Sequence, residues 1–189
     1  MEKPSKFRSF IAIDLPKSLI DYISIIIQKL KSSDDFKKVH CRWVKPNNIH
    51  ITVKFLGNIS EEQHKKITDS LNKLLLDCEP FYLIVNKILP FPVAKPRMVI
   101  LDIEPNPQLD RLATIIEIET EKHGIPQEHR PFKPHITLAR IESNPFPKIE
   151  NSEFTITKFD VTEIKLYKSE PSPSGSKYTQ LTSFSLIKK

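Results

Sequence analysis

The sequence predicts an α+β fold: two pseudo-symmetric lobes with antiparallel sheets around a central cleft. Three observations predict it. A His-x-Thr motif occurs twice in the 189 residues, at His50–Thr52 and at His135–Thr137. The segments Val44–Pro46 and Phe132–Pro134, each containing Lys-Pro, precede the two motifs. Finally, the predicted strands often adjoin one another instead of alternating strictly with helices, which is typical of antiparallel sheets.

The first half is predicted to contain two strands and two helices. A strand over residues 8–13 opens the fold, and Pro16 then stands where a helix would begin. The apolar residues of that helix recur at helical spacing: Leu19, Ile20, Ile23, Ile27 and Leu30. The strand with His50 covers residues 49–55. Ser60 and Gln63 form a capping-box pattern. A second helix follows and ends before Pro80, with apolar positions Ile67, Leu71, Leu74 and Leu75.

The second half begins with two predicted strands, over residues 81–87 and 97–103. Asn106 and Pro107 then start a third helix, and Gly124 is placed to end it as the C′ residue. The apolar positions inside this helix are Leu109, Leu112, Ile115 and Ile116. The strand with His135 follows, and then strand-like runs over residues 154–161, 163–168 and 178–186, with residues 170–175 as a linker. No strong linker separates the halves. We therefore expect residues 1–189 to form a single domain with two internally related lobes, one motif in each.

The alternation of polar and apolar residues supports a strand at the first motif. The odd positions from residue 49 to 55 are all apolar, whereas His50, Thr52 and Lys54 occupy the even positions. This period of two is that of a half-buried strand. The second motif is less regular, because simple alternation puts Ala139 on the face of His135.

Composition narrows the class of protein. The chain is 39% hydrophobic and 28% charged, with a net charge of +6 and a pI of about 9.2. This charge suits a polyanionic partner such as RNA, although a modestly lysine-rich surface explains it equally well. The absence of a run of about 18 apolar residues predicts no membrane span. Cys41 and Cys78 are most simply read as reduced thiols, which predicts a cytoplasmic protein.

Several chemistries lack their sequence signatures. The three glycines, Gly57, Gly124 and Gly175, are too far apart for a P-loop or a dinucleotide-binding loop. No histidine or cysteine pair has the spacing of a zinc site, and no Gly-x-Ser-x-Gly segment occurs. We therefore expect neither a metal nor a cofactor.

The paired motifs predict the chemistry directly. Residues two apart on a strand point to the same face, so each motif presents an imidazole beside a hydroxyl. If the two halves face each other, the cleft holds two of each. Such a set donates one proton, accepts another and donates hydrogen bonds to an anion, as metal-free phosphodiester hydrolysis requires. The alternative is that these are strand residues with incidental polarity.

With the motifs in these contexts, the sequence resembles the 2H phosphoesterase superfamily. Within it, the chain is similar to the bacterial and archaeal RNA 2′,3′-cyclic phosphodiesterases, also called LigT-like or 2′–5′ RNA ligase proteins. The matching segments are Arg8–Pro16, Arg42–Val44, Asn48–Gly57, Phe91–Pro92, Arg130–Arg140 and Gly175–Tyr178.

The resemblance implies a LigT-like fold with the motifs on facing strands. It also implies hydrolysis of a terminal 2′,3′-cyclic phosphate to a 2′-phosphomonoester without a metal, and possible weak joining of RNA ends as a 2′–5′ linkage. The family pattern makes His50 the proton donor and His135 the proton acceptor. Thr52 and Thr137 are expected to donate hydrogen bonds to the phosphate.

Four further residues are candidates for substrate binding. Arg140 could bind the phosphate through two nitrogens of its guanidinium group. Simple alternation puts it off the His135 face, so it reaches the cleft only if a bulge or the strand end intervenes. Lys54 has the parity of His50 and Thr52, which would place it on the cleft face. The alternative is an ordinary solvated lysine. Phe10 and Tyr178 could stack a base or line the cleft, and the alternative for each is packing in the core.

The expected partner is RNA with a 2′,3′-cyclic phosphate terminus. We expect no membrane association, and a monomer. Two alternatives stay open: an RNA-end binding module with little turnover, and a 2H phosphodiesterase acting on another cyclic phosphate or oligonucleotide end.

Overall fold

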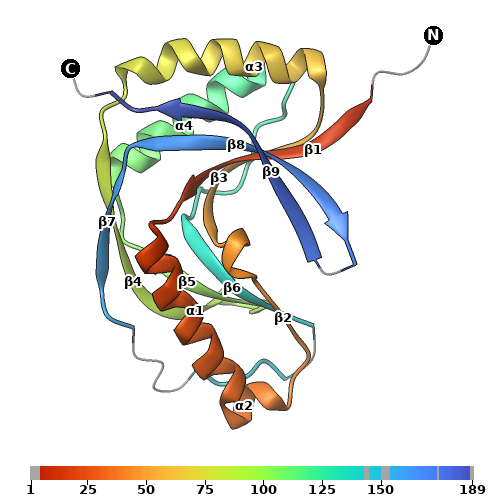
Figure 1. Ribbon diagram of the computed structural model, residues 1–189, viewed down its shortest axis with the longest axis vertical. Coiled ribbons are helices and arrows are strands. Elements are labelled where there is room, and N and C mark those ends of the chain that lie inside the picture. The colour runs from red at the N-terminus through yellow and green to blue at the C-terminus, as the bar shows by residue number, and fades with distance from the viewer. Residues whose placement is uncertain (1–4, 143–144, 150–153, 174, 188–189) are drawn as a thin grey trace.

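The computed structural model describes residues 5–142, 145–149, 154–173 and 175–187. Its strands are β1 (Lys6–Asp14), β2 (Cys41–Trp43), β3 (His50–Ser60), β4 (Phe81–Phe91), β5 (Met98–Ile103), β6 (His135–Ile141), β7 (Thr157–Val161), β8 (Glu163–Ser172) and β9 (Gly175–Ser185). The helices are α1 (Lys17–Ser32), α2 (Asp34–Lys37), α3 (Glu61–Leu74) and α4 (Pro107–Lys122), with 3₁₀ turns η1 (Pro46–Asn48) and η2 (Leu75–Asp77). The strands form one curled antiparallel sheet in the order β7-β4-β5-β6-β3-β1-β8-β9, with β2 paired to β6 (Figure 1).

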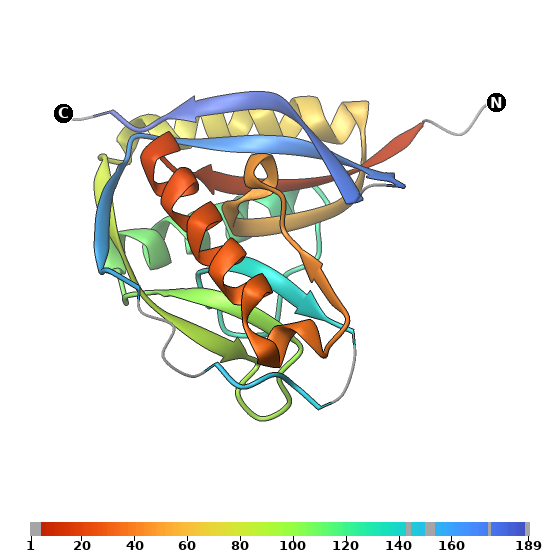
Figure 2. The same cartoon turned by 60° about the horizontal axis from the view of Figure 1, so that its bottom comes forward.

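The pair of strands β6 and β3 stands at the middle of the sheet, and apart from β2 four strands lie in each half. We call β3, β1, β8 and β9 the first-motif half, and β6, β5, β4 and β7 the second-motif half. Helices α3 and α4 lie beside the first-motif half, and α1 runs across the other (Figures 1 and 2). The Tyr22 ring of α1 packs 5.3 Å from that of Phe154, just before β7. The predicted α+β architecture is confirmed, and its two halves share one continuous sheet.

The helix-start signals in the sequence are confirmed. Helix α1 follows Pro16. The Ser60 hydroxyl accepts the Gln63 N–H, and the Gln63 side chain accepts the Ser60 N–H, which completes the capping box of α3. The Asn106 side chain accepts the Leu109 N–H at the start of α4. These bonds satisfy amide groups that have no partner inside a helix.

Some predicted boundaries are wrong. Residues 170–175 are not a linker, because β8 and β9 continue to Ser172 and Gly175 and form a hairpin; Ser174 is outside the described residues. Pro171 lies beyond the part of β8 that pairs with β1, so its missing N–H removes no bond on that side. β7 starts only at Thr157. The short elements β2 and α2 were not predicted, since three or four residues carry no periodicity.

Each motif strand contains a β-bulge directly after its threonine. On β3, Thr52 pairs with Ala12 and Lys54 pairs with Ile11, so Val53 is an extra residue. On β6 the partners of Thr137 and Ala139 are likewise adjacent on β5, so Leu138 is extra. A bulge reverses the faces of the residues that follow it.

The bulge overturns the prediction that Lys54 faces the cleft. Lys54 is 6% exposed, and its ammonium group donates to Glu117 Oε1 at 2.5 Å and to the Pro126 carbonyl at 2.9 Å. Its neighbour Phe55, predicted to be buried, is 60% exposed and takes the face of Thr52. Simple alternation failed here because it assumes an unbroken ladder.

Candidate functional site

The two motifs lie side by side at the centre of the sheet. Within the described residues, Ile51 and Ile136 form the ladder pair between β3 and β6, and both are fully buried. Continuing this antiparallel register by one residue places the histidine of each motif opposite the threonine of the other. The resemblance implied facing strands, whereas the motifs occupy adjacent strands. The four polar side chains therefore share one face of the sheet.

A backbone carbonyl orients each imidazole. His50 Nδ1 lies 2.7 Å from the Asn48 carbonyl oxygen, and His135 Nδ1 lies 2.7 Å from that of Lys133. A carbonyl can only accept a hydrogen bond, so each Nδ1 carries a hydrogen and donates it. In both motifs Nε2 is consequently the nitrogen that gains or loses a proton.

The first-motif threonine contacts that reactive nitrogen. His50 Nε2 lies 3.0 Å from Thr52 Oγ1. The hydroxyl donates to Nε2 when the ring is neutral and accepts from it when the ring is charged. Thr137, like Thr52, is half-buried on its strand. Both hydroxyls therefore border the space into which the histidines point.

Burial is the main influence on both histidine pKa values, and it lowers each of them. The nearby charges differ in sign. The Asp14 carboxylate raises the pKa of His50, while His135 lowers it. The Arg140 guanidinium lowers the pKa of His135, while Asp102 raises it. An anion on one side and a cation on the other favour unequal protonation of the pair.

Asp14 belongs to a hydrogen-bonded network beside the first histidine. It is the β1 ladder partner of His50. The Lys165 ammonium and the Tyr167 hydroxyl both donate to its carboxylate at 2.8 Å. Two side chains of β8 thus hold the β1 carboxylate next to the His50 imidazole. The sequence analysis assigned no role to this residue, because only the register places it opposite His50.

Arg140 lies on the same face of the sheet as the two histidines because of the β6 bulge, as its candidate role required. It is exposed, and its pairing with Met98 on β5 puts it past Thr137 on the same side of the sheet. Arg140 Nη1 lies 3.2 Å from Met98 Sδ. Among the described residues no carboxylate pairs with Arg140, so its guanidinium is open to an anion.

Aromatic rings surround His50. The Phe10 ring lies 5.0 Å from the imidazole, and it also contacts Tyr167 at 5.5 Å and Tyr178 at 4.9 Å. Because Phe10 is only 4% exposed, it supports the imidazole and offers no free face to a base, against its expected role in binding. Tyr178 is half-buried, with its ring 5.4 Å from that of His50.

The second motif has matching neighbours. Phe91 stacks on His135, with ring centroids 5.0 Å apart and planes inclined by 28°. Asp102 of β5 is the ladder partner of His135, as Asp14 is of His50. The sequence analysis gave Phe91 and Asp102 no role. Their pairing to the motif strand is not visible in a linear pattern, although Phe91 stood in a segment that carried the resemblance.

Two structural features bear on the class of protein. The described residues contain no group of three or more His, Cys, Asp or Glu side chains arranged to hold a metal ion. In the same part of the chain, no helix has both the length and the apolar character needed to cross a membrane.

The chain is similar to several known proteins. A family model described as the 2′-5′ RNA ligase superfamily matches residues 21–172. The chain is 30% identical to the RNA 2′,3′-cyclic phosphodiesterase of Methanothermobacter thermautotrophicus, over 96% of this chain and 100% of that protein. It is also 30% identical to the proteins of that name from Thermotoga maritima, with 92% of each chain covered, and from Escherichia coli, with 95% and 96% covered.

Solved structures of similar proteins share this fold. The chain matches E. coli LigT complexed with 3′-AMP with a TM-score of 0.78 at 28% identity, covering 97% of this chain and 99% of that one. It matches the TT0787 protein of Thermus thermophilus with a TM-score of 0.79 at 29% identity, covering 95% and 97%. Each likeness thus covers nearly the whole length of both chains.

Proposed function

The chain belongs to the 2′-5′ RNA ligase superfamily, and from this premise we propose that it hydrolyses the 2′,3′-cyclic phosphate at the end of an RNA strand to a 2′-phosphomonoester. One observation carries the chemistry: two imidazoles on one sheet face, each with Nδ1 bound to a carbonyl and Nε2 available. Four relatives that carry this enzyme name are 27–30% identical over most of the chain.

In the proposed mechanism, His135 Nε2 takes a proton from a water molecule as the water attacks phosphorus. His50 Nε2–H protonates O3′ as the P–O3′ bond breaks, which leaves the phosphate on O2′. Thr52, Thr137 and Arg140 donate hydrogen bonds to the non-bridging oxygens, where negative charge builds in the transition state. Proton exchange with solvent then restores the starting protonation of both histidines.

The charges next to each imidazole support this assignment of donor and acceptor. The donor must be charged when the substrate binds, and the Asp14 carboxylate favours the charged form of His50. The acceptor must be neutral, and the Arg140 guanidinium disfavours the charged form of His135. Asp102 raises the pKa of His135, but less than Arg140 lowers it, so the charges around each imidazole still favour this assignment over the reverse one.

We propose that the enzyme acts as a cytoplasmic monomer on RNA ends. All the catalytic groups come from one chain, so no second copy is needed to complete the site. Cys41 and Cys78 are free thiols, which is typical of a reducing compartment. The net charge of +6 favours a polyanionic substrate.

Turnover of a 2′,3′-cyclic mononucleotide by histidine variants tests the proposal. His50→Ala and His135→Ala should each lower kcat by at least about 10²-fold, the scale of general acid–base catalysis. Far-UV circular dichroism should show an unchanged fold. Near-native turnover by either variant would overturn the assignment, and tight binding of RNA ends with no turnover by the wild type would favour the binding module.

The product and the metal requirement are read from the same assay. Phosphorus NMR should show the 2′-phosphate, and the rate should persist in excess EDTA. A 3′-phosphate product would mean either that the substrate binds in the opposite sense in the cleft or that the two histidine roles are exchanged. Loss of activity with chelator, restored by one divalent ion, would require a different mechanism.

A further inference from the structure

An open pocket of about 560 Å³, lined mostly by polar and charged residues, adjoins the sheet face that carries the two histidines, at its His50 end. It lies between the η1 turn, which directly precedes β3, and the end of the β8–β9 hairpin. Its lining residues are Lys45, Pro46, Asn47, Asn48, Ser172, Ser176, Lys177 and Tyr178. Pockets that bind small ligands are on the order of 300–1,000 Å³, so this one has room for a nucleotide.

The pocket is continuous with the site already described. The Asn48 side-chain amide donates to the Ser176 carbonyl at 2.7 Å and so ties η1 to β9. The backbone carbonyl of the same Asn48 accepts from His50 Nδ1. Tyr178 both lines the pocket and packs its ring edge-on against the His50 imidazole. An RNA strand whose 3′ end lies at His50 can therefore extend into the pocket.

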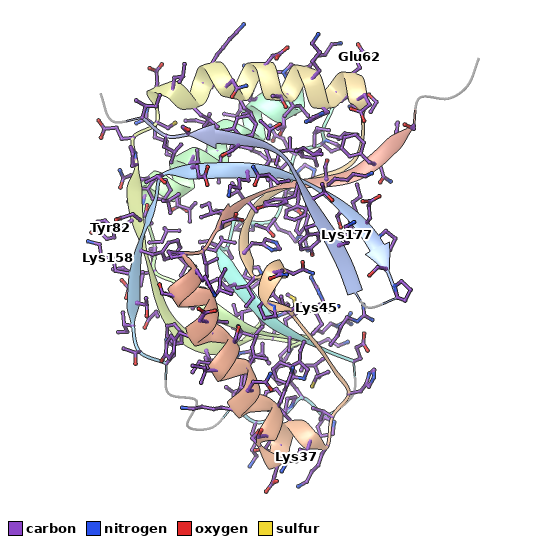
Figure 3. All side chains as sticks on the ribbon, viewed as in Figure 1. Lys37, Lys45, Glu62, Tyr82, Lys158 and Lys177 are labelled. Atoms are coloured by element: carbon purple, nitrogen blue, oxygen red, sulfur yellow. The ribbon has the colours of Figure 1, made fainter. Side chains whose placement is uncertain are left out.

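Two lysines give the pocket its charge. Lys45 and Lys177 are both exposed, and neither pairs with a carboxylate among the residues that the structure describes. Figure 3 shows them beside η1 and the β8–β9 hairpin, on one side of the molecule. Several other exposed lysines, such as Lys17 and Lys66, form salt bridges. Exposed ammonium groups without a carboxylate partner suit a phosphodiester.

Ribose geometry indicates which part of the RNA lies there. In the ribose ring C3′ is bonded to C4′, which carries C5′ and the upstream phosphodiester, whereas C2′ is bonded to C1′, which carries the base. The histidine that protonates O3′ therefore stands on the side from which the upstream strand leaves. If His50 is that histidine, as proposed above, the strand leaves toward the pocket.

We propose that the pocket binds the nucleotide immediately 5′ of the cyclic end, which makes single-stranded RNA oligonucleotides better substrates than cyclic mononucleotides. Lys45 and Lys177 contact the phosphodiester, and the Tyr178 ring offers a stacking surface, as in other proteins that bind single strands. The inference rests on the proposed function, because it uses His50 as the donor to O3′.

The test compares two substrates with the same terminal nucleotide: a 2′,3′-cyclic mononucleotide and a short single-stranded oligonucleotide ending in it. The ratio of their kcat/KM values should be at least about five for the wild type and fall at least about fivefold in Lys45→Ala/Lys177→Ala. Losing two phosphate contacts should reduce the slope of log kcat/KM against log salt by about 1.4 for the oligonucleotide.

A charge-matched control is Lys37→Ala/Lys158→Ala, since these lysines lie on α2 and β7, away from the pocket (Figure 3). The control should keep the wild-type ratio and salt slope. Equal ratios in the pocket variant and the wild type would overturn the inference, as would a wild type with no preference for the oligonucleotide.

Failure of the proposed function is a separate outcome, namely no hydrolysis of either substrate by the wild type. Fluorescence anisotropy with a single-stranded RNA oligonucleotide bearing a 3′-phosphate then still decides the inference. Binding should be at least about fivefold weaker in the pocket variant than in the control variant. Equal binding by the two variants would overturn it.

Discussion

The two motif histidines make the same backbone hydrogen bond but have different charged neighbours. Each donates its Nδ1–H to the carbonyl two residues earlier in the chain, at 2.7 Å. Asp14, held by Lys165 and Tyr167, stands next to His50, and Arg140 stands next to His135. Near-symmetric strands thus carry an asymmetric pair of proton-transfer groups, as a reaction with one acid and one base requires.

The pH dependence of kcat/KM follows from the lowered pKa values of both histidines. The active enzyme holds one proton on the pair, so the profile should be bell-shaped. Burial lowers both pKa values from the ordinary 6.5, so protonation of His135 removes activity only at a lower pH, and His50 loses its proton earlier as the pH rises. The maximum should therefore lie below about pH 6.5. A flat profile, or a maximum well above pH 7, would contradict the assignment.

Arg140→Ala should have two effects. The loss of a charged donor to the transition state should lower kcat by about 10²-fold. Removing the cation that lowers the pKa of His135 should also move the acid limb of the kcat/KM profile to higher pH. Arg140→Lys should restore the position of the limb more fully than the rate, because an ammonium group lacks the paired geometry of a guanidinium. If neither kcat nor the acid limb changed in Arg140→Ala, Arg140 would have no role in the reaction.

At the scale of single elements, the bulges in β3 and β6 decide which residues reach the cleft. After Val53 the chain turns Lys54 toward α4, and after Leu138 it turns Arg140 toward the histidines. The buried ammonium group of Lys54 is compensated by Glu117 and by a carbonyl, which assigns it to the packing of α4 on β3.

Glu117→Gln should destabilise the fold and spare the chemistry. Lys54 is 6% exposed, so removing its partner leaves a buried charge without a counterion, at a cost of about 3 kcal/mol in the free energy of unfolding. Urea denaturation measures this cost, and kcat at a permissive temperature should stay within about twofold of wild type. A large loss of kcat with unchanged stability would contradict this structural role and indicate that Lys54 takes part in the reaction.

At the scale of the whole molecule, the two halves are joined through β3 and β6, where Ile51 and Ile136 are fully buried. The catalytic set therefore depends on the junction itself. Helix packing adds to it, since α1 follows a strand of the first-motif half and yet covers the second-motif half (Figures 1 and 2).

A continuous sheet predicts a single cooperative unfolding transition. Trp43, the only tryptophan in the sequence, lies on β2 against β6, so its fluorescence reports on the second-motif half. Far-UV circular dichroism reports on both halves. The thermal midpoints from the two probes should coincide. Separate midpoints would show that the halves are independent domains, against the single domain predicted for residues 1–189.

Local patterns were enough to predict the helix starts, most apolar positions of the helices and the paired histidines and threonines, although Leu74 of α3 is exposed. Capping at Ser60 and Asn106 depends on neighbouring residues alone, and a repeated motif is visible without a fold. Lys54 and Phe55 were misplaced because a bulge depends on the partner strand, which a linear pattern does not contain.

Only the tertiary structure decided how the site is charged. Asp14, Tyr167, Phe91 and Asp102 meet the histidines through ladder pairs and ring contacts between segments far apart in the chain. The sequence by itself determined the reactive groups, because imidazole and hydroxyl chemistry belongs to the residue. Their pKa values, orientation and accessibility were decided by the fold, because burial, register and neighbouring charge exist only once the sheet has formed.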